Sequence, residues 1–226
     1  MSKSLIAGAN LTKTYGSKKN PIKALGPVSF EIQDGSFTVI LGRSGSGKST
    51  LLNLMAGLDK LTDGNLRVGE DDLTKINSIK LAKYRSKIGI IFQFYNLLPN
   101  LDTLENVMMG SWAGGKTGNK QEAVDLLTRF GLEHRIHSNV KTLSGGEKQR
   151  VAICRALVGG PEILFCDEPT GALDSVNEDQ VKDILNDLNK KDGLTIVMVT
   201  HNPEFAELAD TVIKMKDGAI QEFLVK

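Results

Sequence analysis

Two segments of this 226-residue chain have the glycine spacing and polar neighbours that suit phosphate binding. The first, residues 42–50, matches the pattern G-x-x-x-x-G-K-[ST], whose backbone N–H groups surround the phosphates of a nucleoside triphosphate. In this pattern Lys48 neutralises the β- and γ-phosphates, and the Ser49 hydroxyl reaches a Mg²⁺ ion. The nucleotide-binding residues that this segment predicts are Gly42, Arg43, Ser44, Gly45, Ser46, Gly47, Lys48, Ser49 and Thr50.

A pair of carboxylates follows a strand-length apolar run at residues 163–166. Open α/β sheets bind their ligands beyond the carboxyl ends of strands, which is where Asp167 and Glu168 stand. We expect Asp167 to hold Mg²⁺ through a water. Glu168 is expected to orient and polarise the water that attacks the γ-phosphate.

The second glycine-rich segment, residues 143–150, has the sequence Leu-Ser-Gly-Gly-Glu-Lys-Gln-Arg. Ser144, Gly145 and Gly146 open a predicted helix, whose N-terminus offers a further site for phosphate. Since one phosphate loop cannot use both segments, we expect a second copy of the chain to use this one. On the residues alone, an N-capped helix after a flexible lead-in explains the same pattern.

The elements that position these groups follow an α/β pattern. Buried strands, rich in β-branched or aromatic residues and separated by helical patterns, are predicted at residues 37–41, 88–92, 163–166 and 195–200. They indicate a mainly parallel core sheet. Residues 5–11 and 27–32 are predicted to form an antiparallel β layer, and residues 48–57 a helix that Gly57 ends.

A strand-free segment, approximately residues 95–160, predicts a helical subdomain inserted in a single domain that spans residues 1–226. Capping-box spacing from Asp102 to Glu105 starts one helix, and two more are predicted at residues 120–130 and 146–158. Further along the chain, Asn202 and Pro203 predict a helix that reaches residue 209, and Asp217-Gly218 predicts a hairpin.

Composition excludes several classes of protein. With 28 basic and 27 acidic residues the net charge is +1, so no basic field favours nucleic acid. The apolar runs fall short of the about 18 residues that a membrane span needs, and the first residues lack a secretory signal, so we expect a cytoplasmic chain.

Cys154 and Cys166 are predicted to be buried, reduced thiols. His134 and His137 lack a third ligand and are predicted to be solvated.

Together these segments resemble the nucleotide-binding subunits of ATP-binding cassette (ABC) transporters, over essentially the whole chain. Residues 143–150 look like the signature motif of that family, although Glu147 stands where glutamine is commoner. The resemblance implies a P-loop NTPase fold and Mg²⁺-dependent ATP hydrolysis. It also implies a homodimer in which Ser144, Gly145 and Gly146 contact the γ-phosphate held by the opposite subunit.

Four single residues gain roles from this resemblance. Gln93 is similar to the glutamine that touches Mg²⁺ and water, and His201 to the switch histidine that hydrogen-bonds the γ-phosphate. Asp174 resembles the D-loop aspartate at the dimer seam. Tyr15 matches the aromatic residue that stacks on adenine, although a core or edge tyrosine is the alternative. The catalytic set that the resemblance implies is Lys48, Gln93, Glu168 and His201.

Three functions compete for this pattern. A small-molecule kinase leaves residues 143–150 and His201 unexplained, and soluble DNA-repair, chromosome-organising or translation-associated relatives usually carry coiled-coil, zinc-hook or second-cassette features that this chain lacks. We therefore interpret the chain as a transporter ATPase, held at the inner face of the cell membrane by a separate integral membrane permease. Segments 94–99, 169–175 and 200–204 look like the subgroup of macrolide-exporter and lipoprotein-releasing ATPases, which implies export or extracytoplasmic mechanical work.

The loop at residues 93–101 is expected to dock a cytoplasmic helix of the permease. Tyr95, Leu97 and Leu98 are the expected apolar contacts, because they cluster in a loop bounded by asparagine and proline. A loop tucked against the helical subdomain is the alternative.

Overall fold

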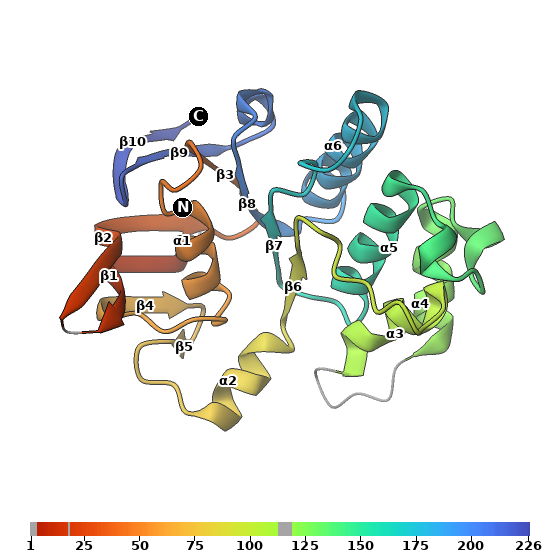
Figure 1. Cartoon of the computed structure of the whole chain (residues 1–226), viewed down its shortest axis with the longest axis horizontal. Helices are drawn as coiled ribbons and strands as arrows, with labels where there is room; N and C mark the ends of the chain where they lie inside the picture. The colour runs from red at the N-terminus through yellow and green to blue at the C-terminus, as the bar shows by residue number, and fades with distance from the viewer. Residues whose placement is uncertain (1–3, 18, 113–118) are drawn as a thin grey trace.

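The computed structural model describes residues 4–17, 19–112 and 119–226. Within these ranges the chain forms a six-stranded and a four-stranded β-sheet, with helices between and beside them (Figure 1). The predicted α/β class, with a mainly parallel core sheet and an antiparallel β layer, is confirmed. No helix of the described ranges is both long and apolar enough to span a bilayer.

The six-stranded sheet has the strand order β10-β9-β3-β8-β7-β6. Its strands pair in parallel except for β10, which runs antiparallel to β9. The inner strands are apolar and buried on both faces, as parallel sheets covered by helices require. The strands are β3 (Phe37–Leu41), β6 (Ile88–Ile91), β7 (Ile163–Asp167), β8 (Thr195–Thr200), β9 (Thr211–Lys216) and β10 (Ala219–Val225).

The register of this sheet aligns the carboxyl ends of β3, β7 and β8. Leu41 pairs with Thr200, and Asp167 pairs with Val199. The phosphate loop, Glu168 and His201 follow these strand ends directly, so all three begin at one edge of the sheet.

The four-stranded sheet is antiparallel, with the order β2-β1-β4-β5. Its strands are β1 (Ser4–Ser17), β2 (Asn20–Gln33), β4 (Asp63–Val68) and β5 (Asp71–Asp72). Helix α1 (Lys48–Met55) lies between the two sheets (Figure 1), where Ile6, Leu52 and Phe165 share one apolar core. β1 and β2 run beyond the predicted strands because their hydrogen bonding continues, through register shifts, after the apolar alternation stops.

A second apolar core lies in the helical region. It is built by α3 (Thr103–Trp112), α4 (Lys120–Arg129), α5 (Gly145–Leu157) and the 3₁₀ turns η1 (Glu133–Arg135) and η2 (Val140–Thr142). The capping box before α3 is present: Glu105 N donates to Asp102 Oδ1 and Asp102 N donates to Glu105 Oε2, both at 2.8 Å. α5 also packs against β6 so closely that a Cβ at Gly89 would lie 2.3 Å from the Ala156 carbonyl oxygen. This helix therefore joins the helical region to the central sheet.

The remaining helices cover the sheet and connect its strands. α6 (Ser175–Lys190) packs Val181, Leu185 and Leu188 on the face opposite α1, and α2 (Ser78–Arg85) precedes β6. The helix predicted to run from Pro203 to residue 209 is instead the short 3₁₀ helix η3 (Pro203–Glu207). The chain must leave it early, because Asp210 Oδ2 accepts from Phe37 N at 2.8 Å and β9 begins one residue later.

Two further sequence predictions are confirmed. The turn between β9 and β10 contains Asp217 and Gly218, both with positive φ (51° and 73°), as a tight hairpin requires. Cys154 and Cys166 are buried free thiols, and desolvation raises the pKa of both. They are therefore inert as nucleophiles at neutral pH.

Candidate active site

The phosphate loop makes a tight turn between β3 and α1. Gly45 and Gly47 have φ values of +79° and +95°, and a Cβ at Gly47 would lie 2.7 Å from the Ala24 carbonyl oxygen of β2. α1 begins at Lys48, and its first turn has neither a side-chain cap nor an acidic residue. Its terminal N–H groups are therefore available to an anion, which the helix dipole favours.

Lys48 folds back over this loop. Its Nζ donates to the carbonyl oxygens of Gly42 and Arg43 at 2.8 and 3.2 Å, and lies 3.7 Å from Glu168 Oε1. The side chain is 6% exposed. Burying a charge is costly unless it has close partners, and these contacts are the partners of the Lys48 ammonium group. An incoming phosphate could replace them and form an ion pair with Lys48.

A cavity of about 520 Å³ opens above the loop, at the aligned strand ends. Its lining combines three residues of the phosphate loop with three further side chains that are expected to act on the γ-phosphate. The lining residues are Arg43, Ser44, Lys48, Gln93, Glu168 and His201. The structure thus brings together all four residues of the expected catalytic set, which come from four different segments of the chain.

Asp167 and Ser49 meet at the side of this cavity. Ser49 Oγ donates to Asp167 Oδ1 at 2.9 Å, which links the start of α1 to the end of β7. Burial raises the pKa of Asp167, and the Glu168 charge adds to this, while Ser49 and Lys48 oppose it. A divalent cation beside Asp167 would favour its charged form and so oppose the effect of burial. The described residues contain no group of three or more His, Cys, Asp or Glu that could hold a metal by themselves. Two protein oxygens plus phosphate oxygens is the donor set that suits Mg²⁺, so the residues fit it.

Glu168 lies between Lys48 and His201. Its Oε2 is 2.8 Å from His201 Nδ1, and its Oε1 faces Lys48. Its backbone has a φ of +47°, a conformation that non-glycine residues rarely adopt and that is often kept at functional sites. The His201 side chain is 67% exposed, and within the described ranges its ring hydrogen-bonds only Glu168.

Gln93 follows β6 and reaches the same cavity. Its Nε2 lies beside Gly171, where a Cβ would approach to 3.3 Å. Gly171 N donates to the Glu168 carbonyl oxygen at 3.1 Å, which closes a turn after β7. Gln93 is thus adjacent to the turn that carries the two carboxylates.

Ser144, Gly145 and Gly146 lie elsewhere, at the N-terminus of α5. In Figure 1, α5 stands on the far side of β6 and β7 from α1, and none of the three residues lines the 520 Å³ cavity. Ser144 and Gly145 are exposed. The structure therefore gives the chain a second exposed helix N-terminus that its own phosphate loop does not use.

Glu147 completes a capping box at this helix. Glu147 N donates to Ser144 Oγ at 3.2 Å, and Ser144 N donates to Glu147 Oε2 at 2.8 Å. The backbone hydrogen bond from Ser144, helped by Arg135, lowers the pKa of Glu147 to about 2. Arg135 Nε donates to its Oε1 at 2.8 Å. Sequence reasoning noted the glutamate in this motif but missed Arg135, which no local pattern pairs with it.

Asp174 caps α6 and connects to the same helix N-terminus. Its Oδ1 accepts from Asn177 N at 2.9 Å and from Asn177 Nδ2 at 2.8 Å, and these hydrogen bonds lower the pKa of the carboxyl. Asn177 Oδ1 in turn faces Gly146, where a Cβ would lie 1.8 Å away. Asn177 was missed, although its position three residues after an N-cap aspartate was a usable signal.

Tyr15 lies on β1, beside the phosphate loop. β1 pairs with β2 so that Tyr15 faces Ile22, two residues from the Ala24 carbonyl that contacts Gly47. Its side chain is 39% exposed, and its hydroxyl donates to Asp59 Oδ2 at 2.7 Å. Burial, and then this hydrogen bond, raises the pKa of Tyr15. The ring is therefore available to a planar ligand near the start of α1.

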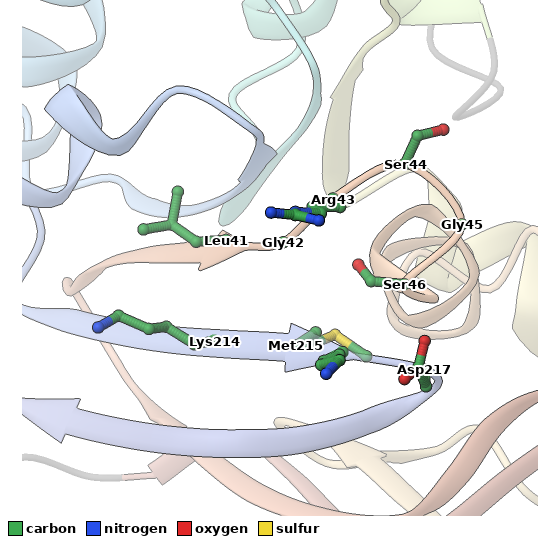
Figure 2. A pocket seen from close by; sticks show the side chains of 10 residues that line it. Leu41, Gly42, Arg43, Ser44, Gly45, Ser46, Lys214, Met215 and Asp217 are labelled. Carbon is green, nitrogen blue, oxygen red and sulfur yellow. The ribbon is translucent and has the colours of Figure 1, made fainter.

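A second cavity of about 580 Å³ adjoins the loop on its β9 side (Figure 2). It lies between residues 41–46 and residues 214–217, and Arg43 lines both this cavity and the catalytic one. Figure 2 shows the Ser46 side chain turned toward this side of the loop. The phosphate loop is thus open on two sides, but Glu168, Gln93 and His201 line only the 520 Å³ cavity.

Comparisons with known proteins agree with this geometry. The family model described as ABC transporter matches residues 25–171. The chain is 40% identical to the lipoprotein-releasing system ATP-binding protein LolD of Geobacter metallireducens, with 96% of this chain and 98% of that protein covered. It is also 40% identical to the macrolide export ATP-binding/permease protein MacB of Syntrophobacter fumaroxidans, of which it spans only 31%.

Solved structures with a similar fold are also ABC transporter cassettes. A dimeric bacterial ABC transporter cassette, MJ0796, superposes with a TM-score of 0.90 at 38% identity and covers 97% of this chain and 98% of its own. A post-hydrolysis dimer of the same cassette, bound to ADP and Pi, gives a TM-score of 0.88. The fold, the catalytic cavity and these relatives together place the chain in the ABC transporter family, as an ATP-binding ATPase cassette.

Proposed function

We propose that this cassette hydrolyses Mg²⁺-ATP at two sites shared by two copies of the chain in a head-to-tail, two-fold dimer. Each site would combine the phosphate loop of one copy with Ser144, Gly145 and Gly146 of the other. The observation that carries this proposal is the exposed N-terminus of α5, which no group of its own catalytic cavity uses. The dimeric state of the cassette MJ0796 supports it.

In the proposed reaction the chain's own groups have separate tasks. The free N–H groups of α1 and Lys48 bind the β- and γ-phosphates, and Ser49 with Asp167 would hold Mg²⁺, which neutralises phosphate charge. When a γ-phosphate enters, it competes with Glu168 for His201, because the histidine now contacts that carboxylate at 2.8 Å. The released Glu168 then polarises the attacking water, which Gln93 helps to position.

The test uses Glu168→Gln, which keeps the side-chain shape but removes the charge that polarises water. This variant should accumulate as an ATP-bound dimer in gel filtration, and it should remain monomeric with ADP or without nucleotide. A variant that binds ATP but stays monomeric would overturn the shared sites.

A separate membrane permease is the proposed partner, and an apolar groove of about 390 Å³ is the proposed docking surface. The groove lies between the end of α1, β6, α3 and α5, and Leu58 and Leu98 expose 41% and 43% of their surface on it. A cytoplasmic helix of the permease is the proposed occupant, since an apolar helix face fits such a groove.

The docking residues differ from those expected. Of the three apolar side chains named for residues 93–101, only Leu98 is exposed; Leu97 packs into the helical core, and Tyr95 is half-buried beside Gly145. Leu97 is partly buried because the loop lies against the apolar core of the helical region, to which α3 and α5 contribute. Phe94 is 73% exposed and stands between Phe92 and Asn96, which line the groove, so we propose it as an apolar contact beside the groove.

Arg155 connects the groove to the nucleotide sites. Its guanidinium donates to the backbone carbonyls of Tyr95 and Asn96, which follow Gln93. Arg155 stands in the last turn of α5, and Ser144 caps the first. A rigid helix thus runs from the proposed docking groove to the proposed dimer contact, so that a permease bound to one state of the dimer would shift its equilibrium.

Leu98→Asp and Phe94→Asp test this surface. Both should prevent co-purification with the permease. Leu98→Asp places a charge in the apolar groove, where it loses hydration, and Phe94→Asp removes an exposed apolar side chain from the same loop. Phe223→Asp is the matched control, since Phe223 is also exposed but lies on β10, at the opposite edge of the sheet from β6. Unchanged co-purification in the first two variants would place the permease elsewhere.

Export or extracytoplasmic mechanical work is proposed from the relatives, whose names are macrolide export ATP-binding/permease protein and lipoprotein-releasing system ATP-binding protein. The proposed location is the cytoplasmic face of the cell membrane, through the permease. No nucleic-acid partner is proposed, because the net charge of +1 supplies no attraction for one.

A further inference from the structure

Three side chains form a closed network at the edge of the nucleotide site. Asp59 stands at its centre: its Oδ2 accepts from the Tyr15 hydroxyl at 2.7 Å, and its Oδ1 accepts from Lys13 Nζ at 2.6 Å. Lys60 N also donates to Oδ1, at 2.7 Å. Lys13 Nζ reaches the Lys60 carbonyl at 2.7 Å and lies 4.6 Å from the centre of the Tyr15 ring.

This network fixes the ring at two places. The hydroxyl is held at its tip by a carboxylate, and one face of the ring is covered by an ammonium group at cation–π distance. Only the opposite face is left for a planar ligand. Lys13 and Asp59 expose just 11% and 27% of their side chains, so their ion pair is better ordered than a surface pair.

The network is also attached to the phosphate loop. Asp59 N donates to the carbonyl oxygen of Asn53 in α1 at 3.2 Å, so the anchor follows directly from the helix that the phosphate loop begins. The Tyr15 hydroxyl additionally contacts the Thr50 side chain, and Thr50 is the last residue of that loop. The ring therefore has a fixed position relative to the phosphate loop.

We propose that Asp59, together with Lys13, is a positioning residue that holds the Tyr15 ring ready for the nucleobase of ATP. This rests on the proposed function, in which Tyr15 stacks on adenine. A tyrosine with 39% exposure would otherwise sample several orientations, and ordering it would oppose binding. Because stacking uses the face of the base and not its edges, the anchor strengthens ATP and GTP binding alike.

The experiment compares equilibrium binding of ATP with that of inorganic tripolyphosphate, which has the phosphates but no base. Asp59→Asn and Tyr15→Phe should each weaken ATP binding by about 2- to 10-fold, the range expected for the loss of one preordered side chain. Tripolyphosphate binding should not change in either variant. The double variant should be no weaker than Asp59→Asn alone, because Tyr15→Phe removes only the hydroxyl whose carboxylate partner has already been replaced.

Two controls make the result specific. Asp63→Asn removes a nearby exposed carboxylate, which accepts from Gly64 N at 2.8 Å and is not part of the network, and it should leave both affinities unchanged. Tyr15→Ala removes the ring itself and should weaken ATP binding more than Tyr15→Phe does.

Each contrary outcome has a distinct meaning. Wild-type ATP affinity in Asp59→Asn and Tyr15→Phe would overturn the anchor, and an equal loss for tripolyphosphate would show that Asp59 only supports the phosphate loop. If Tyr15→Ala kept full ATP affinity, or if the unaltered chain bound neither ligand, the proposed nucleotide site itself would be wrong.

Discussion

Gly146→Ala should block assembly of the shared site without weakening ATP binding to the phosphate loop. A Cβ at this position would lie 1.8 Å from Asn177 Oδ1, and Cβ contacts essentially never fall below 3.0 Å. One group must therefore move by about 1.2 Å, the difference between these distances. Asn177 cannot yield freely, because its backbone and side-chain amides both donate to Asp174, at 2.9 and 2.8 Å.

The added methyl group of Gly146→Ala would strain the first turns of α5 and α6, where Gly146 and Asn177 lie. Overpacking of this kind costs about 1 to 3 kcal/mol, since neighbours must shift to admit one extra methyl group. If the closed dimer needs the present arrangement, that cost lowers the apparent affinity of ATP-dependent dimerisation by about 5- to 150-fold. Nucleotide binding to a single subunit should not change, because Gly146 lies outside the catalytic cavity.

Analytical ultracentrifugation of Gly146→Ala in the Glu168→Gln background, titrated with ATP, measures this effect. Adding Asn177→Ala removes the obstructing oxygen and should recover most of the lost affinity. Dimerisation of Gly146→Ala at the background level would refute the reasoning. A loss that Asn177→Ala does not recover would also refute it, because the cause would then not be the contact with Asn177.

Glu147→Gln should lower the free energy of unfolding by up to about 3 kcal/mol at pH 7 in urea denaturation, because the folded-state pKa of Glu147 is about 2 and its ordinary value is 4.5. A lowered pKa stabilises the folded state fully above pH 4.5. The difference in free energy of unfolding between variant and wild type should therefore shrink as the pH falls toward 2. A difference that stays constant over this pH range would contradict the prediction. Lys48→Ala should abolish productive ATP binding in equilibrium titration, whereas His201→Ala should bind ATP nearly as before and turn over slowly. Equal losses of ATP affinity in Lys48→Ala and His201→Ala would contradict the assignment of Lys48 to binding and His201 to turnover. Cys154 and Cys166 should react with a thiol reagent only on unfolding, and rapid labelling of the native chain would show that they are not buried.

Sequence patterns predicted those parts of the fold in which one segment determines its own structure. The phosphate loop and the strands at residues 37–41 and 195–200 are continuous, and their apolar runs are buried as predicted. Ser144 and Glu147 form a capping box because the spacing between them is local. The positions of the catalytic groups followed from one rule, that parallel strands align their carboxyl ends.

Features that depend on distant segments escaped prediction. β4 and β5 are short and carry charged residues. β4 forms on the hydrogen-bonding edge that β1 offers, and β5 then pairs with β4. Asp59 has no local pattern that points to Tyr15, from which it is 44 positions away. Leu97 is apolar in an exposed-looking loop, and only the core made by α3, α4 and α5 explains its burial. In each case tertiary contact, not propensity, decided the structure.

Intermolecular disulfide formation tests the central claim most directly. Ser44 of the phosphate loop and Ser144 are both exposed, and the native Cys154 and Cys166 are buried, so two engineered cysteines would react without interference. One tagged copy would carry Ser44→Cys and a differently tagged copy Ser144→Cys, both with Glu168→Gln. A disulfide needs Cα atoms within about 7 Å. With ATP, and not with ADP, the two copies should become linked to each other. ATP-bound copies that form no such link would contradict a catalytic site shared between two subunits.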